Sequence, residues 1–248
     1  MKIYVCMDDT DQLDSPGTGH LAQDLCEGIE NNRWGTCSAI SRHQLYVHDD
    51  IPYTSHNSAM CFEADVAEDV LKLLIDFSSA FLREKSAPGS DPGLCVVVDH
   101  RTLDREKLTG FGRRAQNTVL DKKTAYGLAA ELSIHLSEHG GTGQGVVGAL
   151  AGVGLRMGGN DGRFRGWYHL GRTGESITVG SLTSHDFIDS VRCQTGEFLA
   201  DDTIICFGGE ELKTVLQEGK QVLLVKRKTN GSEPGHWITL TKQEVKIY

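Results

Sequence analysis

Three carboxylates follow directly on an apolar run at the start of the chain, and this junction constrains the fold more than any other feature. Residues 3–7 form a short run rich in β-branched and aromatic side chains, which predicts a buried strand. Asp8, Asp9, Thr10 and Asp11 come next, so we expect them at the carboxyl end of that strand. Open α/β sheets place their ligands at this end of their strands. The sequence therefore predicts an α/β fold with a ligand site beside its first strand.

These acidic residues predict a cation site next to a phosphate site. Carboxylates as dense as those of Asp8, Asp9 and Asp11 repel one another, and such a cluster commonly holds a hard cation such as Mg²⁺. Thr18 opens a predicted helix after a turn-rich loop, and the free N–H groups of a helix start suit a phosphate. The alternative is an acidic strand end that is solvated at the surface. We favour Mg-nucleotide chemistry, because so acidic a segment is costly to place there for packing alone.

Composition sets limits on the class of protein. The chain has 248 residues, of which 39% are hydrophobic and 24% charged, as in ordinary globular proteins of one or two domains. The net charge of −9 argues against a protein that wraps nucleic acid by general electrostatics, although it allows a local basic patch. No apolar run approaches the ~20 residues of a membrane span, and no signal peptide is recognisable, so we expect a cytoplasmic protein without membrane partners.

The cysteines predict reduced thiols. Seven cysteines are scattered along the chain, often inside apolar runs, and no two of them form a C-x-x-C pair. A structural zinc site is therefore not expected, and buried thiols in a reducing compartment explain the cysteines most simply.

A layered α/β domain is predicted for residues 1–158. Helices are expected at residues 18–29, 66–82 and 122–137 and from Gly145 onward, and further strands within 38–47, 59–63 and 94–98. The glycines of Gly159-Asn160-Asp161-Gly162 interrupt the pattern, so we place a domain boundary there. For residues 159–248 we expect a smaller β-rich module with strands at 177–179, 203–207, 221–225 and 236–240 and one short helix at 210–217.

The glycines before the last N-terminal helix allow two interpretations. Gly143, Gly145 and Gly148 match the dinucleotide fingerprint only weakly, because the element before them is predicted as a helix rather than a strand. A glycine loop at a helix start lets the backbone approach a phosphate. The same glycines would equally allow tight helix packing, and the sequence leaves both interpretations open.

Two other patterns carry less weight. His135, Glu138 and His139 match an H-x-x-E-H zinc pattern, but they fall at the end of a predicted helix. Arginines and aromatic residues alternate between Arg156 and Arg172, which suits a nucleic-acid backbone but is just as common in an exposed hairpin. No Ser/His/Asp or Cys/His signature supports nucleophilic acyl chemistry.

Several segments, in their order along the chain, together resemble a known family. They are the acidic run at 8–11, Thr18 followed by Leu21 and Ala22, the loop Ile51-Pro52-Tyr53 with Asn57, Asp91-Pro92-Gly93 before an apolar strand, and the glycine-rich stretch at 143–151. They resemble the kinase-like N-terminal domain of the archaeal agmatidine synthases, which modify the wobble cytidine of an isoleucine tRNA. The resemblance covers approximately residues 1–155.

The resemblance implies ATP and Mg²⁺ as cofactors and names the site residues. In that family the domain phosphorylates its own threonine early in the first helix, and Thr18 is the matching position here. Asp8, Asp9, Asp11 and Thr18 are then the implied catalytic residues, and the three aspartates the implied metal ligands. The residues implied to contact the nucleotide are Thr10, Gly17, Asn57, Gly143, Gln144 and Gly145. The competing role for Thr18 is that of a helix N-cap, whose hydroxyl never meets a phosphate.

Departures from the family leave three hypotheses. Thr54, Ser55 and His56 stand where the family usually has a lysine and an arginine, and the family's ferredoxin-like domain, single-stranded-nucleic-acid barrel and zinc ribbon are not recognisable. The first hypothesis is an ATP- and Mg²⁺-dependent enzyme that activates or phosphorylates an unidentified small molecule or RNA, with tRNA the less favoured partner. The second is a non-catalytic nucleotide-binding or regulatory protein. The third is a phosphohydrolase that uses Asp9 and Asp11.

Overall fold

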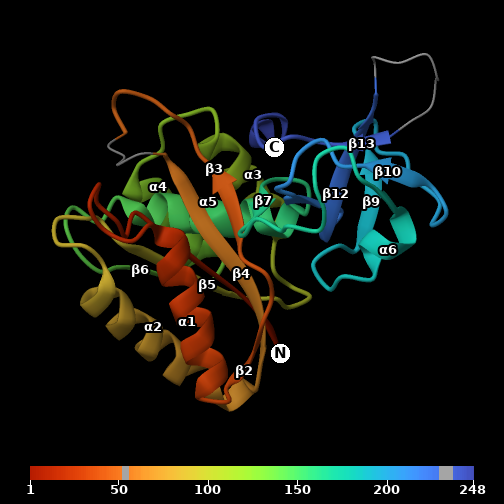
Figure 1. The fold of residues 1–248 in the computed structure, drawn as a ribbon. Helices are drawn as coiled ribbons and strands as arrows, with labels where there is room; N and C mark the ends of the chain where they lie inside the picture. Colours follow the sequence, from red (N-terminus) through yellow and green to blue (C-terminus); the bar gives the residue numbers. More distant parts are fainter. Residues whose placement is uncertain (52–55, 229–236) are drawn as a thin grey trace. The chain divides into compact units, whose positions relative to one another are not determined.

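The chain divides into two compact units of mixed helices and strands. The computed structural model describes residues 1–51, 56–228 and 237–248, and the two units are Met1–Gly158 and Gly159–Tyr248 (Figure 1). Helices and strands are interspersed along the first unit, and strands dominate the second. The predicted α/β (α+β) class is thereby confirmed.

The first unit is built on an antiparallel sheet with the first strand at its centre. Its strand order is β6-β5-β1-β4-β3, and β2 also pairs with β4. The strands are β1 (Lys2–Asp8), β2 (Gly35–Cys37), β3 (Ser41–Gln44), β4 (Ser58–Val66), β5 (Gly93–Val98) and β6 (His135–Glu138). Because β1 lies between β4 and β5, the acidic residues at its end are surrounded by neighbouring chain.

Helices cover both faces of this sheet (Figure 1). Side chains alternate along a strand, so Ile3 and Val5 pack against α1 and α2 while Tyr4 and Cys6 pack on the other face, against α3, α4 and α5. The helices are α1 (Thr18–Asn31), α2 (Leu71–Lys85), α3 (Arg105–Ala115), α4 (Lys122–Glu131) and α5 (Gly145–Gly158), and a 3₁₀ turn, Glu68–Val70, precedes α2. The starts of α1 and α5 both lie at the acidic end of β1.

Two predicted helices of this unit have wrong boundaries. The helix predicted over 122–137 ends at Glu131, the chain turns at Ser133 with a φ of 56°, and β6 follows and pairs with β5. Leu128, Leu132 and Leu136 all pack on one hydrophobic cluster. Their spacing of four residues is that of a helix face, although Leu128 lies in α4 and Leu136 in β6, and this spacing led to the wrong prediction. The helix predicted from Val66 starts at Leu71, because Val66 is the last residue of β4. Neither α3 nor β2 was predicted.

The second unit is a sheet of short strands. Its strand order is β7-β11-β12-β13-β10-β8, and β9 pairs with β12. The elements are β7 (Arg163–Phe164), β8 (Ser176–Thr178), α6 (Val179–Thr183), β9 (Ser190–Cys193), β10 (Ile204–Cys206), β11 (Thr214–Gln217), β12 (Lys220–Arg227), β13 (Trp237–Thr239) and a 3₁₀ turn, Glu244–Ile247. A separate hydrophobic core, with Leu182, Ile205 and Leu223 in it, packs against this sheet.

The helix predicted at 210–217 is wrong. Thr214–Gln217 forms strand β11, which pairs antiparallel with β12. Glu218 and Gly219 connect the two strands, with φ values of 51° and 76°. Two residues with positive φ are what a tight two-residue hairpin requires, so the Glu-Gly turn sets the structure on both sides of it.

Two arginines of the stretch from Arg156 to Arg172 are buried and so do not belong to an exposed basic surface. Arg156 is buried in α5, where its Nε donates to Glu63 Oε1 at 3.1 Å and its Nη2 to Ser38 Oγ at 3.2 Å. Arg163 is buried as well.

All seven cysteines are free thiols, and five of them are buried. Among the helices that the structure describes, none has the length and apolar character needed to cross a membrane.

Candidate functional site

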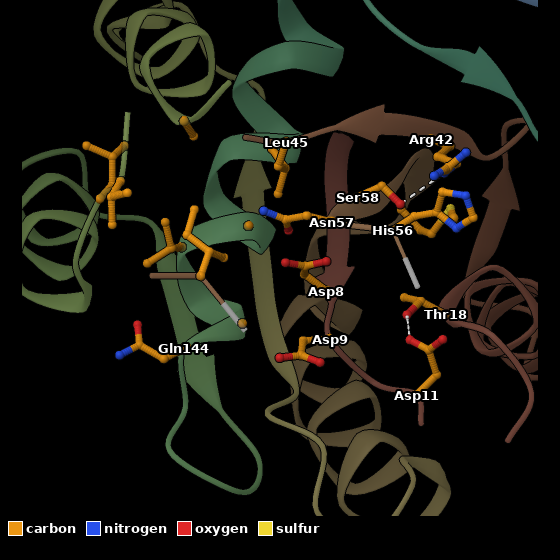
Figure 2. A pocket seen from close by; sticks show the side chains of 18 of the residues that line it. Asp8, Asp9, Asp11, Thr18, Arg42, Leu45, His56, Asn57, Ser58 and Gln144 are labelled. Carbon is orange, nitrogen blue, oxygen red and sulfur yellow. Dashed lines mark hydrogen bonds between the residues drawn. The ribbon is translucent and has the colours of Figure 1, made fainter. Parts of the chain in front are cut away.

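A cavity of about 530 Å³ lies at the carboxyl end of β1 (Figure 2). Its walls come from the starts of α1 and α5, from residues around β3 and β4, and from the connection between α3 and α4. The predicted site residues that line it are Asp8, Asp9, Asp11, Gly17, Thr18, Asn57, Gln144 and Gly145. Thr10 and Gly143 are not part of the lining, although both are buried directly beside residues that are.

Asp8 is the last residue of β1 and has a buried carboxyl group. Its Oδ2 lies so close to Gly148 of α5 that a Cβ at position 148 would overlap with it. Burial, followed by the charge of Asp9, raises the pKa of Asp8 well above its usual range. The start of α5 therefore packs directly on an acidic group that is difficult to ionise.

Asp9 combines backbone strain with electrostatic strain. Its φ is 53°, a left-handed conformation that non-glycine residues seldom adopt. Burial, together with the charges of Asp91 and Asp11, raises the pKa of Asp9 to about 6. Strain of this kind persists where the surroundings enforce it, and it gathers at binding and catalytic sites.

Thr18 and Asp11 form a hydroxyl–carboxylate pair in the cavity wall. Thr18 Oγ1 donates to Asp11 Oδ1 at 2.8 Å and accepts from Thr10 Oγ1 at 3.1 Å (Figure 2 shows the first of these). The N-cap of α1 is Gly17, and Thr18 is the first helical residue, so the competing interpretation of Thr18 as the N-cap is wrong. A hydroxyl with a carboxylate within hydrogen-bond reach is the arrangement of a nucleophile and its base.

The aspartates suit a cation that is shared with a ligand. Within the described parts of the chain, no three His, Cys, Asp or Glu side chains gather into a metal-binding group, so Asp8, Asp9 and Asp11 do not form a complete cage. Mg²⁺ usually binds one or two carboxylates and takes its other oxygens from water and substrate phosphates. Burial is the main cause of the raised pKa values of Asp8 and Asp9, and the charges of the neighbouring aspartates add to it; a bound cation would offset both effects.

The glycine loop is held in place by an aspartate outside the predicted set. Asp91 Oδ1 accepts from the backbone N–H groups of Thr142 and Gly143, and Asp91 Oδ2 accepts from Thr142 Oγ1 at 2.8 Å. A Cβ at Gly145 would overlap with the carbonyl oxygen of Asp91 and lie 2.8 Å from the backbone nitrogen of Gly93. Packing thus explains the glycine at 145. The element before the loop is strand β6, not a helix as predicted.

Gly145→Ala is therefore expected to destabilise the protein by about 1–3 kcal/mol, because the added methyl group has no room. Urea denaturation of the variant and the parent measures this loss. Gly127→Ala is the matched control: Gly127 lies in α4 with nothing within 4 Å of the added Cβ, so it should be neutral or slightly stabilising. Equal stability of Gly145→Ala and the parent would contradict the packing explanation.

Several cavity residues were not predicted. Arg42 and Ser58 come from neighbouring strands, and Val119 and Leu120 from the connection after α3, a helix that the sequence did not indicate. Of the loop singled out by the resemblance, Pro52, Tyr53, Thr54 and Ser55 lie outside the described residues. His56 lines the cavity, and Asn57 Nδ2 donates to Tyr46 O at 2.6 Å. Asp91 could have been predicted as part of the site from the triplet Asp91-Pro92-Gly93, which precedes an apolar strand.

The chain is similar to solved structures of enzymes that are seen with tRNA or named for it. Several of them are of TiaS, a tRNAIle2 agmatidine synthetase. The chain is 28% identical to TiaS in its complex with that tRNA and ATP, with a TM-score of 0.55, over 62% of this chain and 36% of that one. The TiaS complex with the same tRNA, AMPCPP and agmatine gives 27% identity and a TM-score of 0.52 over the same shares. A tRNA fluorescent labelling enzyme gives 28% and 0.53, again over 62% and 36%.

These comparisons confirm the resemblance, as a TiaS-like partial domain. The chain spans about a third of the length of the TiaS chains that it matches. The matched share of this chain is close to the share of the first unit, which holds residues 1–158 of 248. No protein-family model and no curated protein matches the chain.

Proposed function

We propose that the cavity binds ATP with Mg²⁺ and that the chain is an enzyme that activates or phosphorylates a substrate, with Thr18 as its first phosphoryl acceptor. The observation that carries this proposal is the Thr18 hydroxyl, 2.8 Å from the Asp11 carboxylate, in the wall of a cavity that Asp8 and Asp9 also line. The likeness to TiaS, which is seen in complexes with ATP and with AMPCPP, supports it.

Two helix starts and two carboxylates complement a Mg-bound triphosphate. The first residues of α1 and α5 line the cavity, and both helices have 14 residues. The N–H groups and positive dipole ends of such helices favour phosphate oxygens. Asp8 and Asp9 would hold Mg²⁺, which neutralises phosphate charge when bound. The glycines that packing requires at the start of α5 also bring its backbone to the cavity wall.

Phosphoryl transfer to Thr18 needs only groups in this cavity. Asp11 Oδ1 accepts the proton of the Thr18 hydroxyl as Oγ1 forms a bond to the γ-phosphorus. The bond from the γ-phosphorus to the β–γ bridging oxygen breaks, and ADP leaves with the electron pair. The phosphothreonine then lies in the first turn of α1, where the helix dipole offsets its charge.

The final acceptor is a small molecule or an RNA. TiaS is seen with an isoleucine tRNA and with agmatine, and the likeness to TiaS extends these two ligand classes to this chain as a proposal. The net charge of −9 favours a small acceptor over an extended RNA surface. Among the alternatives, a phosphohydrolase would need Asp11 as its acid, whereas Asp11 accepts a hydrogen bond from Thr18. In a non-catalytic nucleotide-binding protein the Thr18–Asp11 pair would serve only to stabilise the start of α1.

Thermal unfolding with ATP, Mg²⁺ and both together tests the nucleotide site. A ligand that binds only the folded state raises the melting temperature, and we expect the combination to raise it more than either component alone. The Asp9→Asn, Asp11→Asn double variant should lose this extra shift. Asp69→Asn, at an exposed position outside the cavity, is the control and should keep it. An equal shift in the double variant and the parent would remove the aspartates from the site.

A further inference from the structure

A triphosphate that enters this cavity meets an excess of negative charge. Besides Asp8, Asp9 and Asp11, the lining includes Asp50 and Asp121. One Mg²⁺ and two helix starts offset only part of the charge that a polyanionic ligand adds. A positively charged side chain in the cavity wall would offset the remainder.

Arg42 supplies such a side chain in the cavity wall. Among the cavity-lining residues that the structure describes, it is the single arginine or lysine. It stands on β3 directly opposite Met60 of β4, another lining residue. Figure 2 shows Arg42 and Ser58 on the same side of the cavity as Thr18. The positive charge of Arg42 is therefore supplied by strand β3, on the side of the cavity where the proposed phosphoryl acceptor Thr18 lies.

The guanidinium group of Arg42 is held in a fixed orientation. Its Nε donates to the buried Ser58 Oγ at 2.9 Å, and its Nη2 donates to Gln44 Oε1 at 3.3 Å. Two hydrogen bonds at different nitrogens fix the plane of a guanidinium group. A planar, oriented group of N–H donors matches phosphate oxygens better than a flexible ammonium does.

We infer that Arg42 binds the β- and γ-phosphate oxygens of the nucleoside triphosphate and stabilises the charge that develops during transfer to Thr18. The inference rests on the proposed function. The phosphates then lie at the Arg42 side of the cavity. The apolar residues Ala115 and Leu120, which belong to or pack on one hydrophobic cluster, remain for the base.

Equilibrium binding of ATP and of adenosine, both with Mg²⁺, tests this assignment. Arg42→Gln should weaken ATP binding about tenfold to a hundredfold, the range for a lost hydrogen bond to a charged group, and leave adenosine binding unchanged. Arg42→Lys should fall between, since it keeps the charge and loses the planar donors. Ser58→Ala, which removes only the partner of Nε, should weaken ATP binding less than Arg42→Gln. Arg101→Gln, at an exposed arginine outside the lining, is the control.

The results that would contradict the role of Arg42 differ from the result that would contradict the proposed function. Unchanged ATP binding by Arg42→Gln, with the parent binding ATP, overturns the role of Arg42 and leaves the proposed function intact. Equal losses for ATP and adenosine also overturn it, because they indicate a structural role for Arg42. If Arg42→Gln fails to fold, the Ser58→Ala variant decides by the same comparison of the two ligands. A parent that binds no ATP overturns the proposed function, and the role of Arg42 falls with it.

Discussion

Asp9→Asn is expected to make the free protein more stable at pH 7 and at the same time to abolish the binding of Mg-ATP. Burial and the charges of Asp91 and Asp11 raise the pKa of Asp9 to about 6, so the ionised carboxylate is held in the folded protein against its preference. Asparagine removes the charge and tolerates the same positive φ. After allowance for solvent screening, we expect a gain of about 1–2 kcal/mol in the free energy of unfolding.

The pH dependence of this gain has a definite sign. Between pH 3.8, the ordinary pKa of an aspartate, and about 6, the folded parent binds more protons through Asp9 than the unfolded chain does. The contribution of Asp9 to stability is therefore fully present below the lower value and is lost as the pH rises through the upper one. Asp9→Asn lacks this loss, so the two proteins should differ more at pH 7 than at pH 4.

Urea denaturation across that pH range, together with ATP binding at pH 7, measures both effects. Asp69→Asn is the control, because it removes an exposed carboxylate outside the cavity and should change neither quantity. If Asp9→Asn were less stable than the parent at pH 7, the burial of a charged Asp9 beside other carboxylates would not be the cost that we infer from the structure.

Thr18→Ala is expected to abolish the incorporation of phosphate from ATP, whereas Thr18→Ser should retain it. The alanine variant loses the nucleophile, and serine keeps a hydroxyl beside Asp11. Asp11→Asn should slow incorporation by about 10²-fold or more, the usual contribution of a general base. Thr18→Ala also loses the hydrogen bonds to Asp11 and Thr10, which lowers stability by about 1 kcal/mol.

Incubation with labelled ATP and Mg²⁺, followed by mass spectrometry of the peptides, locates the phosphate. Under the proposal it appears on the peptide that contains Thr18 in the parent and in Thr18→Ser. A nucleotide-bound parent that carries no phosphate on this peptide would rule out Thr18 as the acceptor. In that case the non-catalytic nucleotide-binding hypothesis becomes the better account of the cavity.

The parts of the fold that were predictable from the sequence are those with local signals. β1 is a continuous apolar run, and α1 and α5 begin where glycines and a turn-rich loop end, so their starts were expected correctly. The secondary structure of the region from Arg105 to Glu138 was difficult to predict for a physical reason. Buried positions require apolar side chains in helices, strands and turns alike, so the apolar residues alone do not tell which of these the backbone forms. Leu132 and Leu136 bury against the same cluster although one follows a helix and the other lies in a strand.

The residues of the candidate site likewise fall into a predictable group and an unpredictable one. Asp8, Asp9, Asp11 and Thr18 are close in sequence, and a strand end followed by a helix start brings them together with no long-range contact. Arg42 and Asp91 reach the same region only through the pairing of β3 with β4 and through the contact of the glycine loop with the start of β5. No spacing in a single sequence reports such contacts.

The close packing of α5 limits how the cavity can diversify. Methyl groups at Gly148 or Gly154 would overlap with Asp8 or Leu108, and one at Gly152 would lie 2.5 Å from the Cys6 sulfur. Gly148 lines the cavity, and Gly152 and Gly154 lie further along α5, so larger residues at these three positions are expected to destabilise the protein. Thr118 and Val119, in contrast, are exposed at the rim between α3 and α4. A lineage that acquires a new acceptor molecule would therefore vary this rim, while the wall of α5 stays the same and preserves the chemistry at the acidic end of β1.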